Sequence, residues 1–82
     1  MDEKPWFVYI LQCRDGSYYT GVSNDVENRM KIHASGKGSK YVAKKGFSHL
    51  ILKKKCKDKS DACKLEYKIK QLPKHDKINA LR

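Results

Sequence analysis

The sequence predicts a small α/β domain built on a three-stranded antiparallel sheet flanked by helices. Two apolar and β-branched runs joined by a short polar turn indicate a β-hairpin over residues 6–22. A third run of this kind covers residues 47–56. Apolar residues at helical spacing lie between and after these runs. The 82 residues suffice for one domain with a modest core. We expect residues 1–82 to form it, with residues 1–5 frayed.

The length of the hairpin loop determines which tyrosines share a face of the sheet, because side chains alternate between faces along a strand. A two-residue turn would place Tyr9 and Tyr19 on opposite faces. A three-residue loop would need Gly16 in the left-handed conformation, and it would pair Leu11 with Tyr19. Tyr9 would then lie opposite Gly21, on the same face as Tyr19. We predict the three-residue loop.

The rest of the chain carries the residue types that begin and end helices. Short polar side chains accept hydrogen bonds from the free amides of a first helical turn, and glycine or proline ends a helix. On this basis we expect four helices: residues 25–34 before Gly36, a short helix between Ser39 and Gly46, a longer helix from Asp58 or Ser60 to residue 72 before Pro73, and residues 74–82.

Two charged or titratable side chains lie on the helix over residues 25–34, beside its apolar stripe. Val26, Met30 and His33 share this stripe, and Arg29 adjoins it. Arg29 and His33 are four residues apart, so they lie one above the other. Because an unpaired guanidinium is costly to bury, Arg29 either reaches solvent, pairs with an acid or receives an anion. His33 either packs or takes part in a site.

The helix after Asp58 carries a carboxylate on its inward side. Glu66 lies at the edge of an apolar stripe that consists of Ala62, Leu65, Ile69 and Leu72. One interpretation is a surface pair between Glu66 and Lys70, worth a few tenths of a kcal/mol. The other is a functional carboxylate, because an acid on the inward side is unusual in a chain that has only nine acidic residues.

The charge of the chain favours nucleic acid as the partner. Nineteen basic residues against nine acidic ones give a formal charge of +10. Candidate contacts to nucleic acid are Lys37 and Lys40, in or beside a glycine-rich connection, together with Lys54 and Lys70. Lys54 belongs to a run of three lysines on the third strand, where lysine also discourages aggregation at a sheet edge. Because side chains alternate between the two faces of a sheet, only part of this lysine run can face one ligand.

Cysteine content and hydropathy argue against several classes of protein. Three cysteines without a C-x-x-C spacing argue against a disulfide framework and a structural zinc site, so we expect thiols packed as small hydrophobic groups. No segment reaches the ~20 apolar residues of a membrane span, and no signal sequence is apparent. We therefore expect a cytoplasmic protein without a membrane partner.

The sequence resembles the GIY-YIG nuclease family in four elements in the correct order. Phe7-Val8-Tyr9, followed ten residues later by Tyr19-Thr20-Gly21, resembles the two signature triplets. Residues 25–33 resemble the first helix with its catalytic arginine, and residues 65–70 resemble the later helix with its metal-binding glutamate. The resemblance covers nearly the whole chain and is closest to small stand-alone members. Phe7 and Val8 depart from the first triplet, and the family's late asparagine has only Asn79 as a counterpart.

This resemblance implies a divalent-metal-dependent endonuclease that hydrolyses phosphodiester bonds in DNA. Mg²⁺ often uses only one or two protein carboxylates, and the arginine fork suits phosphate. A phenol with a pKa near ~10 needs positive charge nearby to act as a base. The implied roles are Tyr9 as general base, Tyr19 as the group that orients water or phosphate, Arg29 as charge stabiliser, His33 as proton carrier or positioner of Tyr9, and Glu66 as ligand of one Mg²⁺ or Mn²⁺.

Two alternatives remain. The altered first triplet and the missing asparagine favour a nucleic-acid-binding module of the same fold without turnover. A small basic RNA-associated protein would bind mostly through phosphates and would use Tyr18, Tyr41 and Tyr67 to stack on unpaired bases. For an enzyme, we expect recognition of a DNA structure such as a branch, flap or nick, because the chain shows no recognition domain.

Overall fold

The computed structural model describes residues 5–82. The frayed start expected for residues 1–5 lies outside this range, except for Pro5, which is exposed. The chain forms β1 (Trp6–Cys13), β2 (Tyr18–Ser23), α1 (Val26–Ala34), α2 (Lys40–Lys45), β3 (Phe47–Cys56), α3 (Lys59–Lys70) and α4 (Lys74–Leu81).

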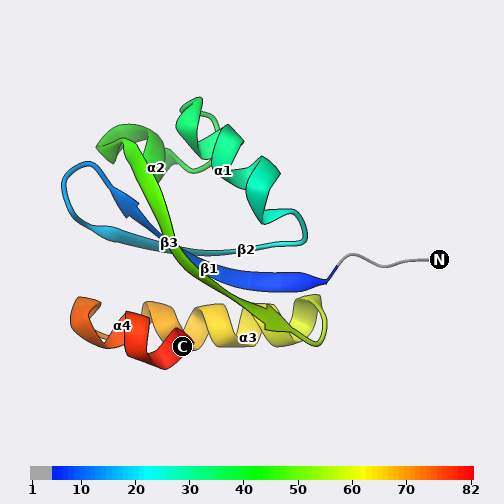
Figure 1. Cartoon of the computed structure of the whole chain (residues 1–82). Helices are drawn as coiled ribbons and strands as arrows, with labels where there is room; N and C mark the ends of the chain where they lie inside the picture. The colour runs from blue at the N-terminus through cyan, green and yellow to red at the C-terminus, as the bar shows by residue number, and fades with distance from the viewer. Residues whose placement is uncertain (1–4) are drawn as a thin grey trace.

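The three strands form one antiparallel sheet, as predicted, and their order is β2-β1-β3. Figure 1 shows α1 and α2 on one face of this sheet and α3 and α4 on the other. The central strand β1 is therefore covered on both faces, while β2 and β3 are the edges. No helix within residues 5–82 is long and apolar enough to cross a membrane.

The hairpin adopts the predicted three-residue loop. Cys13 N–H donates to Ser17 O at 2.8 Å, which leaves three residues in the loop, and Gly16 has φ +87°. The register pairs Leu11 with Tyr19 and Tyr9 with Gly21. Because glycine adopts this positive φ without a Cβ clash, the loop residue at position 16 fixes which face the two tyrosines share.

The helix boundaries follow the capping residues. The carboxylates of Asp25 and Asp58 accept from the amides of residues 28 and 61, at 3.3 and 2.8 Å, and the Ser39 hydroxyl caps α2. Helix α3 ends at Lys70, two residues earlier than predicted. The amide of Leu72 bonds to the carbonyl of Ile69, which tightens the last turn before Pro73.

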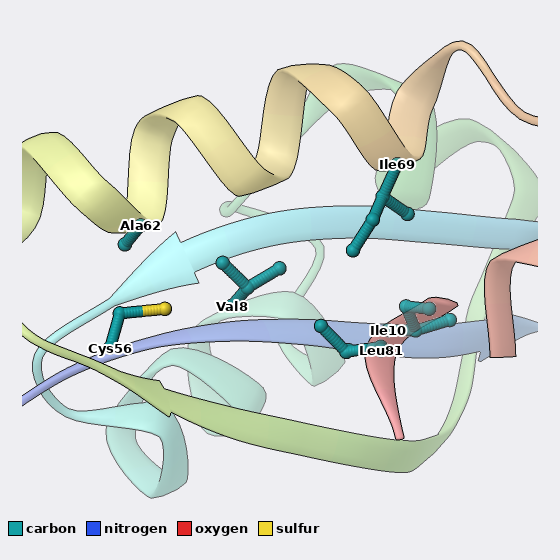
Figure 2. Packing of buried hydrophobic residues seen from close by; sticks show 6 residues of the cluster. All are labelled: Val8, Ile10, Cys56, Ala62, Ile69 and Leu81. Carbon is teal, nitrogen blue, oxygen red and sulfur yellow. The ribbon is translucent and has the colours of Figure 1, made fainter. Parts of the chain in front are cut away.

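Each face of the sheet has its own hydrophobic layer, because alternate residues of β1 point to opposite sides. Figure 2 shows the layer beneath α3 and α4, which consists of Val8, Ile10, Cys56, Ala62, Ile69 and Leu81. The layer beneath α1 and α2 consists of Tyr9, Leu11, Cys13, Val26 and Val42. Cys13 and Cys56 are thus buried as packing groups, one in each layer, and Cys63 is exposed.

Candidate active site

Tyr9 points to the α1 and α2 face, where the absence of a side chain on the neighbouring strand makes room for it. Its register partner is Gly21, and a Cβ atom at that position would lie 2.5 Å from Tyr9 Oη. Tyr9 is 1% exposed. The phenol therefore lies across β2 in a space that any larger residue at position 21 would fill.

The Tyr9 hydroxyl joins the hairpin to α1. Tyr9 Oη and His33 Nε2 form a buried hydrogen bond of 2.8 Å between residues 24 positions apart in the chain. His33 is 1% exposed, and its Nδ1 has no hydrogen-bond partner within residues 5–82. The connection between α1 and α2 packs closely on this ring, since a Cβ atom at Gly38 would lie 2.6 Å from Nδ1.

Tyr19 completes the cluster on its more open side. Its ring centroid lies 6.5 Å from that of Tyr9 and 5.6 Å from that of His33. Unlike these two residues, Tyr19 is only half-buried. Two phenols and an imidazole from β1, β2 and α1 therefore meet at one place, and Tyr19 is the member that a ligand reaches first.

The surroundings of the pair hold both partners in their neutral forms. Burial raises the pKa of Tyr9 to about 12, an effect that Arg29 opposes and that Tyr19 and Glu66 reinforce. Burial also lowers the pKa of His33, and the positive charge of Arg29 lowers it further. Arg29 is half-buried on α1. Its guanidinium is the nearby positive charge that favours an ionised Tyr9.

Glu66 is close enough to act on Tyr9 electrostatically, and it also has a local partner. Its side chain is 22% exposed, and Oε2 lies 3.3 Å from Lys70 Nζ. The same ammonium group lies 5.6 Å from the centre of the Tyr19 ring. Glu66 thus forms the predicted pair with Lys70, and its charge also acts on Tyr9. Sequence reasoning missed the contact of Lys70 with Tyr19, which only tertiary packing creates.

The other predicted lysines lie on different faces. Lys37 is exposed in the connection between α1 and α2, and Lys40 begins α2. Lys54 pairs with Val8, so it points to the α3 and α4 face and is not grouped with the tyrosines. Lys53 pairs with Tyr9 instead, and its Nζ lies 4.9 Å from the centre of the Phe7 ring.

The donor set fits an open site for a hard divalent ion and does not fit a closed metal centre. Within the described part of the chain, no three His, Cys, Asp or Glu side chains converge. Glu66 offers one carboxylate, of which Oε2 meets Lys70. Mg²⁺ commonly keeps several waters and binds through one or two carboxylates plus substrate phosphate. Asn79 is exposed on α4.

Comparisons with known proteins give relatives along nearly the whole chain. The family model of the GIY-YIG catalytic domain matches residues 5–79. The UPF0213 protein OB0043 of Oceanobacillus iheyensis is 46% identical over 81 residues, which cover 99% of this chain and 93% of that protein. The UPF0213 protein YhbQ of Escherichia coli is 42% identical over 73 residues, which cover 89% of this chain and 73% of that protein.

A solved structure supports the fold. The solution NMR structure of the UPF0213 protein BH0048 from Bacillus halodurans superimposes with a TM-score of 0.55 at 43% identity. The match covers 92% of this chain and 80% of that one.

Proposed function

Because the chain belongs to the GIY-YIG family, a family of endonucleases, we propose that it is a divalent-metal-dependent endonuclease that hydrolyses phosphodiester bonds in DNA. One observation carries this proposal: the buried hydrogen bond between Tyr9 and His33, held beside Tyr19 and within the electrostatic reach of Arg29 and Glu66. A phenol, an imidazole, a guanidinium and a carboxylate together provide the groups that a phosphodiester hydrolase uses.

Tyr9 is the proposed general base, and His33 orients it. His33 Nδ1 is buried without a partner, and a buried N–H without an acceptor is rarer in proteins than an acceptor without a donor. We therefore assign the ring proton to Nε2, which donates it to Tyr9 Oη. Once the phenol has lost its own proton, this bond stabilises the phenolate of Tyr9. The phenolate oxygen then takes a proton from the attacking water and becomes the phenol again.

The remaining roles follow from charge and exposure. Arg29 favours ionisation of Tyr9, and its planar fork suits the oxygens of a phosphoryl group. Tyr19 is accessible and orients water or phosphate. Glu66 holds the metal ion, for which Lys70 must give up or share the carboxylate. A bound Mg²⁺ or Mn²⁺ supplies Lewis-acid stabilisation of the charge that develops on the phosphoryl oxygens.

Because its pKa is raised, Tyr9 needs positive charge nearby before it can act as a base. With a pKa of about 12, the phenol is almost fully protonated near neutral pH. Arg29 already opposes this rise, so Tyr9 needs further positive charge nearby before it accepts a proton, and a divalent ion held at Glu66 would supply it. We propose that cleavage rises with pH and with metal concentration for this reason.

A second candidate function is nucleic-acid binding without turnover. The Glu66–Lys70 pair favours it, because Lys70 neutralises the carboxylate that the metal needs. Phe7, in place of the glycine of the first triplet, is a further departure from the catalytic pattern. Binding in this case depends on phosphate contacts and weakens steeply with salt.

The test measures cleavage of labelled duplex, single-stranded, nicked, flapped and branched DNA with Mg²⁺ or Mn²⁺ and with a chelator. We expect metal-dependent cleavage, and we expect Tyr9→Phe and Glu66→Ala each to reduce it at least about hundredfold, as is typical when a proton-transfer group is removed. Thermal unfolding by circular dichroism confirms that each variant is folded.

Matched variants exclude a contaminating nuclease and general surface effects. Tyr67 is 64% exposed on α3, and Glu27 is exposed in the first turn of α1. Tyr67→Phe and Glu27→Ala should therefore cleave like the parent protein. Undiminished cleavage by folded Tyr9→Phe or Glu66→Ala overturns the proposed mechanism. DNA binding without cleavage of any substrate by the parent protein favours the second candidate.

A further inference from the structure

A hollow of about 460 Å³ straddles the outer edge of β2, next to the tyrosine cluster but distinct from the Tyr9–His33 pair. We call it the β2-edge hollow. Its volume lies in the range of small-ligand sites. Its lining is mainly aromatic and basic, with three tyrosines and three lysines: Tyr18, Tyr19, Tyr41, Lys70, Lys74 and Lys77.

The aromatic side of the β2-edge hollow includes a partly exposed tyrosine, Tyr41, with Lys45 Nζ 5.1 Å from the centre of its ring. The Tyr41 ring stacks on that of Tyr19, with centroids 5.9 Å apart and 29° between the planes. Tyr41 nevertheless remains 41% exposed, and with Tyr67 it is one of two large hydrophobic residues exposed within residues 5–82. Tyr18, which alternates with Tyr19 along β2, lines the hollow from the other face of the sheet.

The basic side of the β2-edge hollow comes from the ends of α3 and α4. Lys77 Nζ is held by two carbonyls at the end of α3, those of Ile69 at 3.1 Å and Lys70 at 3.3 Å. Lys74 Nζ lies 4.7 Å from the centre of the Tyr18 ring. Neither Lys74 nor Lys77 forms an ion pair within residues 5–82. Lys74 and Lys77 thus place positive charge beside aromatic rings without a paired carboxylate, whereas Lys70 pairs with Glu66.

A buried hydroxyl lines the same hollow. Thr20 is 3% exposed, and its Oγ1 has no hydrogen-bond partner within the described residues. Leaving a buried polar group without a partner costs roughly 1–3 kcal/mol, so each such group calls for an explanation. Thr20 pairs with Ile10, so its hydroxyl lies buried on the α3 and α4 face with Tyr18, and not on the face of Tyr41.

We propose that the β2-edge hollow is a subsite for one unpaired nucleotide of a DNA strand. The base stacks on the exposed ring of Tyr41, and Lys74 and Lys77 bind the flanking phosphates. This proposal rests on the proposed function in taking DNA as the ligand and in placing the phosphate to be cleaved beside Glu66. Tyr19 and Lys70 belong both to the hollow and to the surroundings of Glu66, so the unpaired nucleotide lies next to the phosphate to be cleaved.

The test measures binding in a chelating buffer, so that it does not depend on cleavage. Fluorescence anisotropy gives Kd for a labelled fully paired duplex, for the same duplex with one unpaired thymidine, and for single strands of DNA and RNA of one sequence. We expect the parent protein to prefer the DNAs with unpaired nucleotides. Tyr41→Ala should raise Kd for these about tenfold, the usual order of a base–aromatic stack, and should change duplex binding less than about twofold.

The chain offers matched controls for both residue types. Tyr67→Ala removes an exposed tyrosine outside the hollow, and Lys64→Met removes a lysine that lines a different depression on the α3 side. Both should bind all the DNAs like the parent protein. Lys74→Met should weaken binding to the unpaired DNAs and serves as the second probe if Tyr41→Ala does not fold.

The outcomes separate this proposal from the proposed function. Loss of discrimination in Tyr41→Ala and Lys74→Met supports the subsite even if the protein cleaves nothing. Cleavage by the parent protein with unchanged discrimination in both variants overturns the subsite alone. Equal losses in Tyr67→Ala or Lys64→Met also overturn it, because the effect then comes from general surface chemistry. RNA bound more than about tenfold tighter than DNA overturns the assignment to DNA.

Discussion

At the scale of single residues, the candidate site depends as much on missing side chains as on those present. Gly21 leaves the space that Tyr9 fills, and Gly38 lets the connection between α1 and α2 pack on His33. A buried hydrogen bond between two rings tolerates little displacement, because close-packed interiors have few voids. The geometry of Tyr9 and His33 is therefore enforced from both sides by backbone.

Replacing Gly38 with alanine should disturb His33 without straining the backbone. Gly38 does not have a positive φ, so alanine fits its conformation, but the new Cβ would lie 2.6 Å from Nδ1. We expect a loss of about 1–3 kcal/mol in unfolding free energy from overpacking. Looser burial should also move the pKa of His33 up toward its ordinary value of 6.5. Chemical denaturation and NMR titration of the imidazole measure the two effects.

Gly36→Ala is the control for this change. Gly36 has φ +83° and nothing within 4 Å of the added Cβ atom, so the cost there is backbone strain of about 1–2 kcal/mol. Its imidazole titration should match that of the parent protein. A His33 pKa that moves equally in the two variants would contradict the steric explanation.

The site residues differ in how far the sequence determines them. Tyr9 and Tyr19 share a face because of one local choice, the three-residue loop at Gly16, and that choice is visible in the sequence. The orientation of Lys54 follows from the same alternation once β3 is paired with β1. In contrast, the contact of Lys70 with Tyr19 joins a helix to a strand across the sheet edge, and no local pattern encodes it.

At the scale of elements, the strands and helices were predictable because their end signals are local. Side chains within three residues cap α1, α2 and α3, and the apolar stripe of α3 meets the sheet as its spacing predicts. Which helices cover which face was not predictable, because amphipathic stripes show only that a helix packs. Figure 1 shows the consequence: α3 lies on the face of the sheet away from α1. The charge of Glu66 on α3 nevertheless acts on Tyr9.

Helix α3 should tolerate loss of its cap with a modest cost in stability and little effect on the site. The Asp58 carboxylate accepts from Asp61 N–H at 2.8 Å, and its removal in Asp58→Ala should lower the unfolding free energy by about 1 kcal/mol. Glu66 lies two turns further on and is held by packing of the stripe around it, so DNA binding and cleavage should persist. Urea denaturation and the cleavage assay check both points.

Asp61→Ala is the comparison, because Asp61 is exposed in the same first turn and its side chain is not the cap. Asp61→Ala should lower the unfolding free energy less than Asp58→Ala does, because it removes only the interaction of a negative charge with the helix dipole. If Asp58→Ala abolishes cleavage in a folded protein, the capping turn holds Glu66 in place more strongly than the packing does.

At the scale of the whole molecule, the net charge favours a polyanionic partner, and the fold determines where that charge lies. The formal charge of +10 predicts attraction to a polyanion from any direction. The structure separates the lysines into those around the tyrosine cluster and those on the opposite side, where Lys54, Lys64 and Lys68 line one depression. Composition alone could not make this separation, because it depends on strand register and on the side of the sheet that α3 covers.

The dependence of DNA affinity on salt shows which lysines touch phosphate. Each neutralised phosphate contributes about 0.7 to the slope of log affinity against log salt for single strands and about 0.9 for duplex DNA. We expect Lys37→Met and Lys40→Met, on the side of α1 and α2, each to reduce that slope by roughly this amount. Lys54→Met should leave it unchanged, because Lys54 points to the other face. An equal reduction in Lys54→Met would mean that DNA also contacts the depression that Lys54 lines with Lys64 and Lys68, and the assignment of binding to the surroundings of the tyrosine cluster would then be wrong.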